Sequence, residues 1–299
     1  MNIDRLLDFE SQALFSIFTY LKENSGFHDI NEISEQVGFE KRTTLKYLER
    51  LASLSDEVEN QLGIPPLIVS ERMYQISREH YTENKELSLA IYHISIKINL
   101  LEGLLSNKAN TMASLMEKYN LSYSTLKKDV YEVRDYLKEV EIELHIRNGE
   151  LVLSGLEPAI RLFFLSFFWQ LYGGYGQPFE LDSSTEKNFI FEKLSFLLSD
   201  HIDPITKLQY DYLVDITLIR YLAGHKIENN ELPIESILIG NKFVQHFHFI
   251  TEENVSAYEH FKDELYFILL FLQSKMVFYR NDQFFQELKK YHQLIDSNI

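Results

Sequence analysis

The sequence predicts a mainly α protein in which two tandem winged helix-turn-helix domains precede an all-helical bundle. Apolar residues recur at helical spacing along most of the 299 residues, and only 11 Gly and 6 Pro interrupt them. The order helix, helix-turn-helix, β-hairpin also occurs twice before residue 155. We therefore expect a first winged domain at 1–82, a second at 83–155 and a helical regulatory or dimerisation domain at 156–299.

The first copy of this order begins with apolar helical spacing over residues 10–24 and 30–37. Gly38 suits the left-handed turn, and Leu45, Leu48 and Leu51 mark the apolar face of the next helix, which Pro65-Pro66 ends. LIVSERMYQIS then predicts two short strands, which would form a wing.

The start of the second helix of this motif is locally basic. Residues 41–50 contain four basic residues and one acidic residue, Glu49. Hydroxyl, amide and cationic groups at this helix start can hold phosphates, and a few side chains such as Arg42 or Lys46 would read base edges. The candidate DNA-binding residues here are Lys41, Arg42, Thr43, Thr44, Lys46 and Tyr47.

The second copy repeats the pattern with an apolar helix at 87–105, a short helix at 111–119 capped by Thr111, and a longer helix from residue 122. Alternating residues around Asn148-Gly149 predict a hairpin wing. The candidate DNA-binding residues are Ser122, Tyr123, Ser124, Thr125, Lys127 and Lys128, with Arg147 near the wing tip. Asp129 and Glu132 offset the positive charge of the two lysines, so we expect the first copy to dominate base readout.

The remaining chain predicts an antiparallel helical bundle. Pro158 suits the first turn of an almost wholly apolar helix that ends near Tyr172. Further helices are expected at 185–199, 205–223, 235–247, 253–276 and 282–296.

Charge and composition limit the possible functions. The formal charge of −16 divides equally, because 1–155 and 156–299 each carry −8, so a DNA-binding surface must be local. Zero Cys excludes disulfide scaffolds and thiol chemistry. No catalytic set, metal site or cofactor fingerprint is visible, so we expect no enzyme, no metal and no cofactor. A signal peptide and an apolar run of about 20 residues are also missing, which predicts a cytoplasmic protein without a membrane partner.

The duplicated motif, including ISEQVGFEKRTTLKYLERL, and GLEPAIRLFFLSFFWQLY after the Asn-Gly hairpin resemble the Mga/AtxA-type (RofA-like) transcription regulators of Gram-positive bacteria. The resemblance implies activators with two DNA-binding domains, followed by regulatory domains like those that the sugar phosphotransferase system controls. Such domains are phosphorylated on histidine, so the resemblance implies His201 and His225, with His260 as a further candidate, and a phosphocarrier protein as partner. This chain has room for one such domain.

The leading hypothesis is a homodimeric transcriptional regulator that binds double-stranded DNA through both winged domains and is controlled through its helical half. The net charge favours an alternative, a winged-helix scaffold that binds protein and no DNA. An RNA-binding antiterminator is a third possibility, but those proteins use a small β-rich domain and this N-terminal half is helical.

Overall fold

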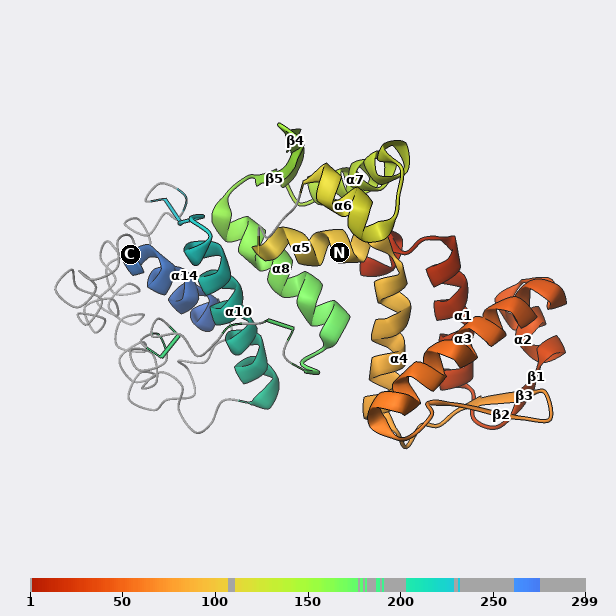
Figure 1. The fold of residues 1–299 in the computed structure, drawn as a ribbon. Coiled ribbons are helices and arrows are strands. Elements are labelled where there is room, and N and C mark those ends of the chain that lie inside the picture. Colours follow the sequence, from red (N-terminus) through yellow and green to blue (C-terminus); the bar gives the residue numbers. More distant parts are fainter. Residues whose placement is uncertain are drawn as a thin grey trace, which may run out of the picture. The chain divides into compact units, whose positions relative to one another are not determined.

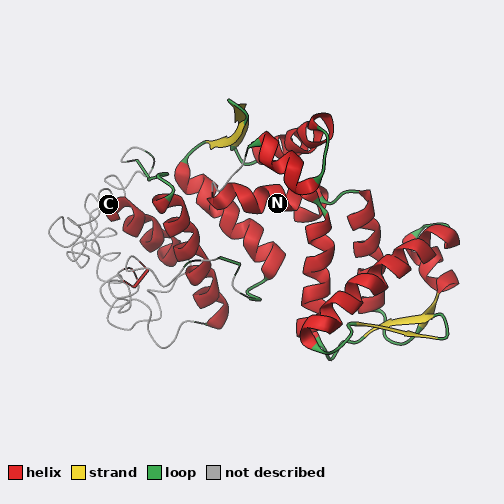
Figure 2. Ribbon diagram, viewed as in Figure 1, coloured by secondary structure: helices red, strands yellow, loops and turns green. Residues whose placement is uncertain are grey.

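A computed structural model describes residues 2–106, 111–176, 203–228 and 261–274. It also describes the single positions 178, 179, 181, 187, 188, 190 and 231. The described part is mainly α, as predicted, with two small groups of strands (Figure 2). No helix within it is long and apolar enough to cross a membrane.

The chain divides into two compact units. The first comprises Met1–Leu104, Ala109–Tyr136 and Gln170–Tyr175, and the second comprises Leu105–Lys108, Leu137–Trp169 and Gly176–Ile299. The domain limits predicted at 82 and 155 stay a prediction.

The first helix-turn-helix lies in the first unit (Figure 1). A 3-10 turn, η1 (Ile3–Leu6), precedes α1 (Phe9–Glu23), α2 (Ile30–Val37) and α3 (Lys41–Leu62). Gly38 ends α2 at φ 75°, the left-handed conformation predicted from the sequence. α3 packs against α1 and α2, so a buried apolar core holds the three helices together. α3 ends at Gly63, which has φ 83°, two residues before Pro65.

A three-stranded antiparallel sheet completes this part of the unit. β2 (Leu67–Ser70) and β3 (Met73–Ile76) form the predicted wing, and the order in the sheet is β1-β3-β2. Glu71 and Arg72 connect them with φ 49° and 67°, which matches a type I′ turn. β1 (His28–Asp29) was not predicted, because two residues are too short to show an alternation.

The helix predicted at 87–105 is two helices, α4 (Tyr81–Ile94) and α5 (Ile96–Ser106). Ser95 separates them with an extended backbone, ψ 120°. Its buried hydroxyl donates to the Leu6 carbonyl at 2.6 Å, and the Asn99 amide donates to the carbonyls of His93 and Ser95 at 2.7 and 2.8 Å. These bonds supply donors to backbone carbonyls at the break. The continuous apolar pattern, which predicts one helix, does not reveal them.

The second helix-turn-helix consists of α6 (Met112–Tyr119) and α7 (Tyr123–Lys138). Thr111 caps α6, as predicted, because its hydroxyl accepts the Ser114 N–H at 3.0 Å. Asn120 ends α6 at φ 50°, so it takes the left-handed turn that Gly38 takes in the first motif.

The second unit contains the second hairpin and the described helices of the C-terminal half. The hairpin has the expected turn, with Asn148 and Gly149 at φ 52° and 83°. The second unit contains β4 (Glu143–Arg147), β5 (Glu150–Ser154), α10 (Pro204–Leu222), α14 (Phe261–Ser274) and, up to Trp169, α8 (Glu157–Tyr172). The helices predicted at 235–247 and 282–296, and most of 185–199, lie outside the described residues.

The α4–α5 break gives a stability prediction. Ser95→Ala removes the donor to the buried Leu6 carbonyl, so we expect the free energy of unfolding in urea to fall by about 1–3 kcal/mol. Ser16→Ala is the control, because the exposed Ser16 hydroxyl makes a similar local bond to the Gln12 carbonyl at 2.8 Å. Equal effects of the two substitutions would contradict this account of the break.

Candidate nucleic-acid interface

The first turn of α3 is exposed and cationic. Lys41, Arg42 and Lys46 are exposed, and Arg50 is exposed beside Glu10 at 3.7 Å. The helix has no side-chain N-cap and no acidic residue in its first turn. Free N–H groups and the helix dipole therefore add to the positive side chains at this end.

Two candidates in α3 are core residues. Thr44 and Tyr47 are 0% and 5% exposed. The Thr44 hydroxyl donates to the Glu40 carbonyl and accepts from the Ser34 hydroxyl at 3.0 Å, so both hydroxyls are satisfied inside the motif. We therefore leave these two side chains out of the interface, while the half-buried Thr43 stays at its edge.

Leu45 was expected on the buried face but is 40% exposed. The hydrogen-bonded Thr44 takes the buried position, so the buried face is Thr44, Tyr47, Leu48 and Leu51. Sequence reasoning missed Leu45 as a surface residue, because a leucine in an amphipathic pattern is normally assigned to the core.

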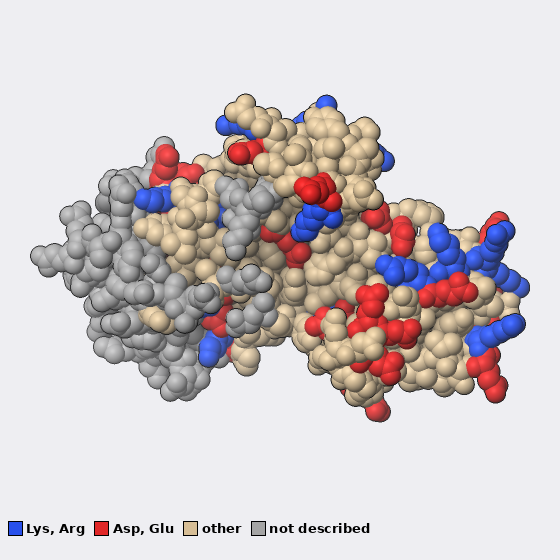
Figure 3. Space-filling view, viewed as in Figure 1, with Lys and Arg blue, Asp and Glu red and all other residues tan. Residues whose placement is uncertain are grey.

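Charge is divided along α3. The N-terminal half carries the cations described above, whereas Asp56, Glu57 and Glu59 are exposed on the C-terminal half. Figure 3 shows Lys and Arg gathered at the α2–α3 end and Asp and Glu gathered where α3 approaches α4. The negative charge of the chain therefore does not cancel the local cationic surface.

The start of α7 is also exposed. Ser122, Tyr123, Ser124 and Thr125 are all exposed, and the Ser122 hydroxyl accepts the Thr125 N–H at 3.2 Å. Lys127 is half-buried, and its ammonium lies 5.8 Å from the ring centroid of Tyr123.

The acidic residues of α7 affect its two lysines unequally. Glu132 accepts from Lys97 of α5 at 2.7 Å and lies 3.7 Å from Lys128. It therefore offsets the positive charge of Lys128, as expected. Asp129 is half-buried, and burial raises the pKa of its carboxyl. Lys127 has no ion-pair partner among the described residues, so its charge is available at the surface.

Arg147 is exposed at the end of β4, opposite Glu150 across the hairpin. It lies in the second unit, whereas the α3 and α7 candidates lie in the first. Within the first unit, the exposed α3 candidates lie together on α3 and the exposed α7 candidates lie together on α7.

His225 is the phosphorylation candidate that the structure describes; His201 and His260 lie outside the described residues. His225 follows the end of α10, where its backbone N–H donates to the Arg220 carbonyl at 2.9 Å. Burial, with the positive charge of Arg220, lowers the pKa of its imidazole. A lowered pKa favours the neutral ring, the form that can accept a phosphoryl group.

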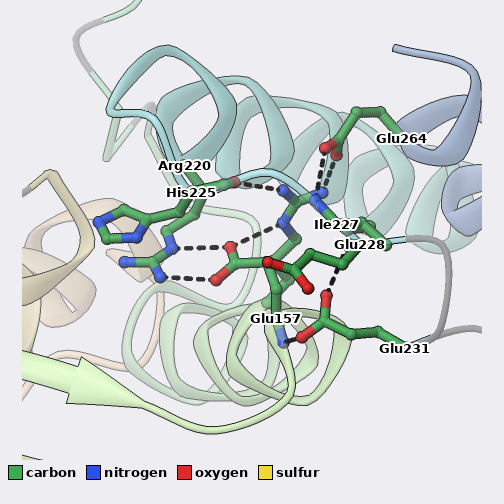
Figure 4. A network of polar contacts seen from close by, with 8 residues as sticks. Glu157, Arg220, His225, Ile227, Glu228, Glu231 and Glu264 are labelled. Atoms are coloured by element: carbon green, nitrogen blue, oxygen red, sulfur yellow. Dashed lines mark hydrogen bonds and ion pairs between the residues drawn. The ribbon is translucent and has the colours of Figure 1, made fainter. Parts of the chain in front are cut away.

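A buried ionic network lies beside this histidine (Figure 4). The carboxylate of Glu157, at the start of α8, accepts from Arg161 at 3.0 Å and from two nitrogens of Arg220 at 2.9 and 2.7 Å. Both arginines are almost completely buried, with 0% and 1% exposure. The His225 carbonyl accepts from Arg161 at 2.9 Å, so the candidate site and the network share a residue.

Glu264 of α14 balances the second positive charge. Its carboxylate accepts from Arg161 and from the Ile227 N–H, the latter at 3.0 Å. Burial raises the pKa of Glu264. Sequence reasoning missed this network, because its members stand far apart in helices that read as apolar.

Comparison with known proteins identifies relatives of the second helix-turn-helix motif. Residues 80–168, from the start of α4 into α8, match the family model described as the Mga helix-turn-helix domain. The capsule synthesis positive regulator AcpB of Bacillus anthracis is 25% identical over 162 residues, which are 53% of this chain and 32% of that protein. The matched region is thus about a third of the relative's length.

Residues 80–168 therefore carry a helix-turn-helix domain of the Mga type. The resemblance to the Mga/AtxA-type regulators is confirmed, and its Mga domain is the second copy of the motif together with most of α8. The first copy, including α3, lies before the matched residues.

The Lys97–Glu132 pair, which joins α5 to α7, gives a pH prediction. Hydrogen bonding to Lys97 lowers the pKa of Glu132 in the folded state. Its stabilisation is therefore present above the carboxyl's ordinary pKa and is lost as the pH falls through the folded value. Glu132→Gln should lower the free energy of unfolding by about 0.5–1 kcal/mol at pH 7, and the difference should diminish as the pH falls through the lowered pKa of the folded state. A difference independent of pH would contradict this assignment.

The buried ionic network of the second unit predicts a larger loss of stability than the Lys97–Glu132 pair does. Glu157→Gln keeps the shape of the side chain but leaves two buried arginines with one carboxylate. We therefore expect the free energy of unfolding of this unit to fall by about 3 kcal/mol or more. Hydrogen exchange of α8 and α10 amides measures it. Exposed Glu228→Gln is the control, and equal protection in both variants would refute the role of Glu157.

Proposed function

We propose that this protein regulates transcription by binding double-stranded DNA through α3 and α7. The observation that carries the proposal is the cationic N-terminal half of α3 on a chain of charge −16, in a helix-turn-helix motif. Cations confined to the helix that enters a major groove are what such binding requires.

The exposed face of α3 supports base readout. Arg42 and Lys46, near the centre of the exposed face, can donate to guanine. These contacts would supply sequence preference, while Lys41 and the open N–H groups of the first turn would hold phosphate.

Dimerisation through the helical half is the second part of the proposal. The acidic bulk makes single-site binding weak and sensitive to salt, so two linked copies would supply the useful affinity. Activation is proposed from the relative's description as a positive regulator. A cytoplasmic location follows from this function.

Control by a phosphocarrier protein at His225, or at His201, is the third part. A phosphoryl group on the His225 ring would carry about two negative charges into the neighbourhood of Arg220, whose partner is Glu157. It would compete with that carboxylate and so change the contacts between α8 and α10.

The test is a titration of promoter DNA fragments with the full chain over a range of salt concentrations. Arg42→Ala with Lys46→Ala should weaken binding, and sequence preference should fall by about 1–3 kcal/mol for each base-reading side chain that is removed. Lys22→Ala with Lys207→Ala removes the same charge from exposed positions on α1 and α10, so it is the matched control.

Three outcomes decide the proposal. A loss in the α3 variant that the control does not show supports it. Equal losses in both double variants would mean that bulk charge alone governs binding, and the α3 assignment would fall. No binding by the wild-type chain at low salt would favour the protein-binding scaffold.

A further inference from the structure

Aromatic and cationic side chains alternate along one side of α7. The Lys127 ammonium lies 5.8 Å from the ring centroid of Tyr123 and 5.4 Å from that of Tyr131. The Arg134 guanidinium lies 4.3 Å from the Tyr131 centroid. Tyr123 and Tyr131 are 48% and 38% exposed, so this arrangement, which we name the α7 stripe, lies on the surface.

The α7 stripe follows one flank of the helix. At 3.6 residues per turn, its four positions fall within an arc of about 80° over a length of about 16 Å. Glu132, which Lys97 holds, and the half-buried Asp129 lie on the far side of the helix. The carboxylate nearest the stripe is Asp135, in an exposed pair with Arg134 at 3.4 Å that contributes little.

The stripe is particular to the second copy of the motif. The buried residues of the two helices align, with Thr44, Leu48 and Leu51 of α3 corresponding to Leu126, Val130 and Val133 of α7. The stripe positions in α3 are then Lys41, Leu45, Glu49 and Ala52. The exposed cations Arg42 and Lys46 instead lie near the centre of the solvent face of α3, where α7 has Ser124 and Lys128.

We propose that the α7 stripe binds the phosphodiester backbone of one strand of duplex DNA, and that α7 supplies affinity while α3 reads sequence. The inference rests on the proposed DNA binding. A helix in the major groove turns the centre of its exposed face to the bases and its flanks to the phosphate walls. Cations on a flank therefore meet phosphates, whereas those at the centre of α3 meet base edges.

The cation–π contacts suggest what the tyrosines between the cations contribute to binding. A ring beside a lysine or arginine restricts the long side chain, so less rotamer freedom is lost when the cation meets a phosphate. Lys127 and Arg134 also lie against the Tyr131 ring, where they would compete with a stacking base. Weak base stacking favours duplex over single-stranded DNA. The two tyrosine hydroxyls can donate to phosphate oxygens as well.

The experiment measures the affinity of the full chain for several unrelated duplexes and one matching single strand over a salt series. Lys127→Met with Arg134→Met should lower affinity about fivefold for each cation removed at 0.15 M salt, equally for all duplexes, and reduce the salt slope by about 2. Tyr131→Leu keeps both charges, so affinity should fall about two- to fivefold with the slope unchanged. Lys22→Met with Lys207→Met is the charge-matched control, and circular dichroism confirms folding.

The outcomes separate this inference from the proposed function. Wild-type binding with stripe variants equal to the control overturns the stripe and leaves DNA binding intact. A loss confined to one duplex means that α7 reads bases and also overturns it, as does tighter binding to the single strand. No wild-type binding to any duplex overturns both proposals.

Discussion

The rotation of α3 and α7 about their own axes is the constraint on which the exposed surface of each helix-turn-helix motif depends. In α3 the buried residues Thr44, Leu48 and Leu51 fix that rotation, and in α7 Leu126 and Val130 do so. Because a helix turns by about 100° per residue, this choice decides which side chains reach solvent. The chemistry offered to a partner therefore follows from the core, and it places Arg42 and Lys46 at the centre of one face and Lys127 on the flank of the other.

Electrostatic partners within the protein decide which charges remain for an external ligand. Lys97 holds Glu132 at 2.7 Å, and Glu157 and Glu264 neutralise the two buried arginines. Counting charges along the sequence treats all of these as equal, although the buried ones exert little field at the surface. A chain of charge −16 can therefore carry a cationic surface, because four basic residues outweigh the single acidic Glu49 at the start of α3, and Asp56, Glu57 and Glu59 lie on its other half.

Much of the fold could be predicted from the sequence, since periodicity and turn residues are local signals. Both helix-turn-helix motifs, the Asn148-Gly149 hairpin and the Thr111 cap are of this kind. The errors come from interactions between distant residues. Ser95 breaks a helix because Leu6 offers a carbonyl, and Thr44 replaces Leu45 in the core because Ser34 offers a hydroxyl. The sequence likewise does not show that Arg161 meets Glu264, 103 positions away.

The ionic network explains how a small chemical change near His225 can affect a whole unit. Exchanging a partner costs far more inside the protein than at its surface, because the freed charge is left unsolvated. Glu157, at the start of α8, binds Arg220 near the end of α10, while Glu264 brings in α14 through Arg161. A charge that draws one arginine away must therefore be compensated by movement of at least one helix. α8 begins three residues after β5, so only Gly155 and Leu156 connect its first turn to the hairpin that carries Arg147.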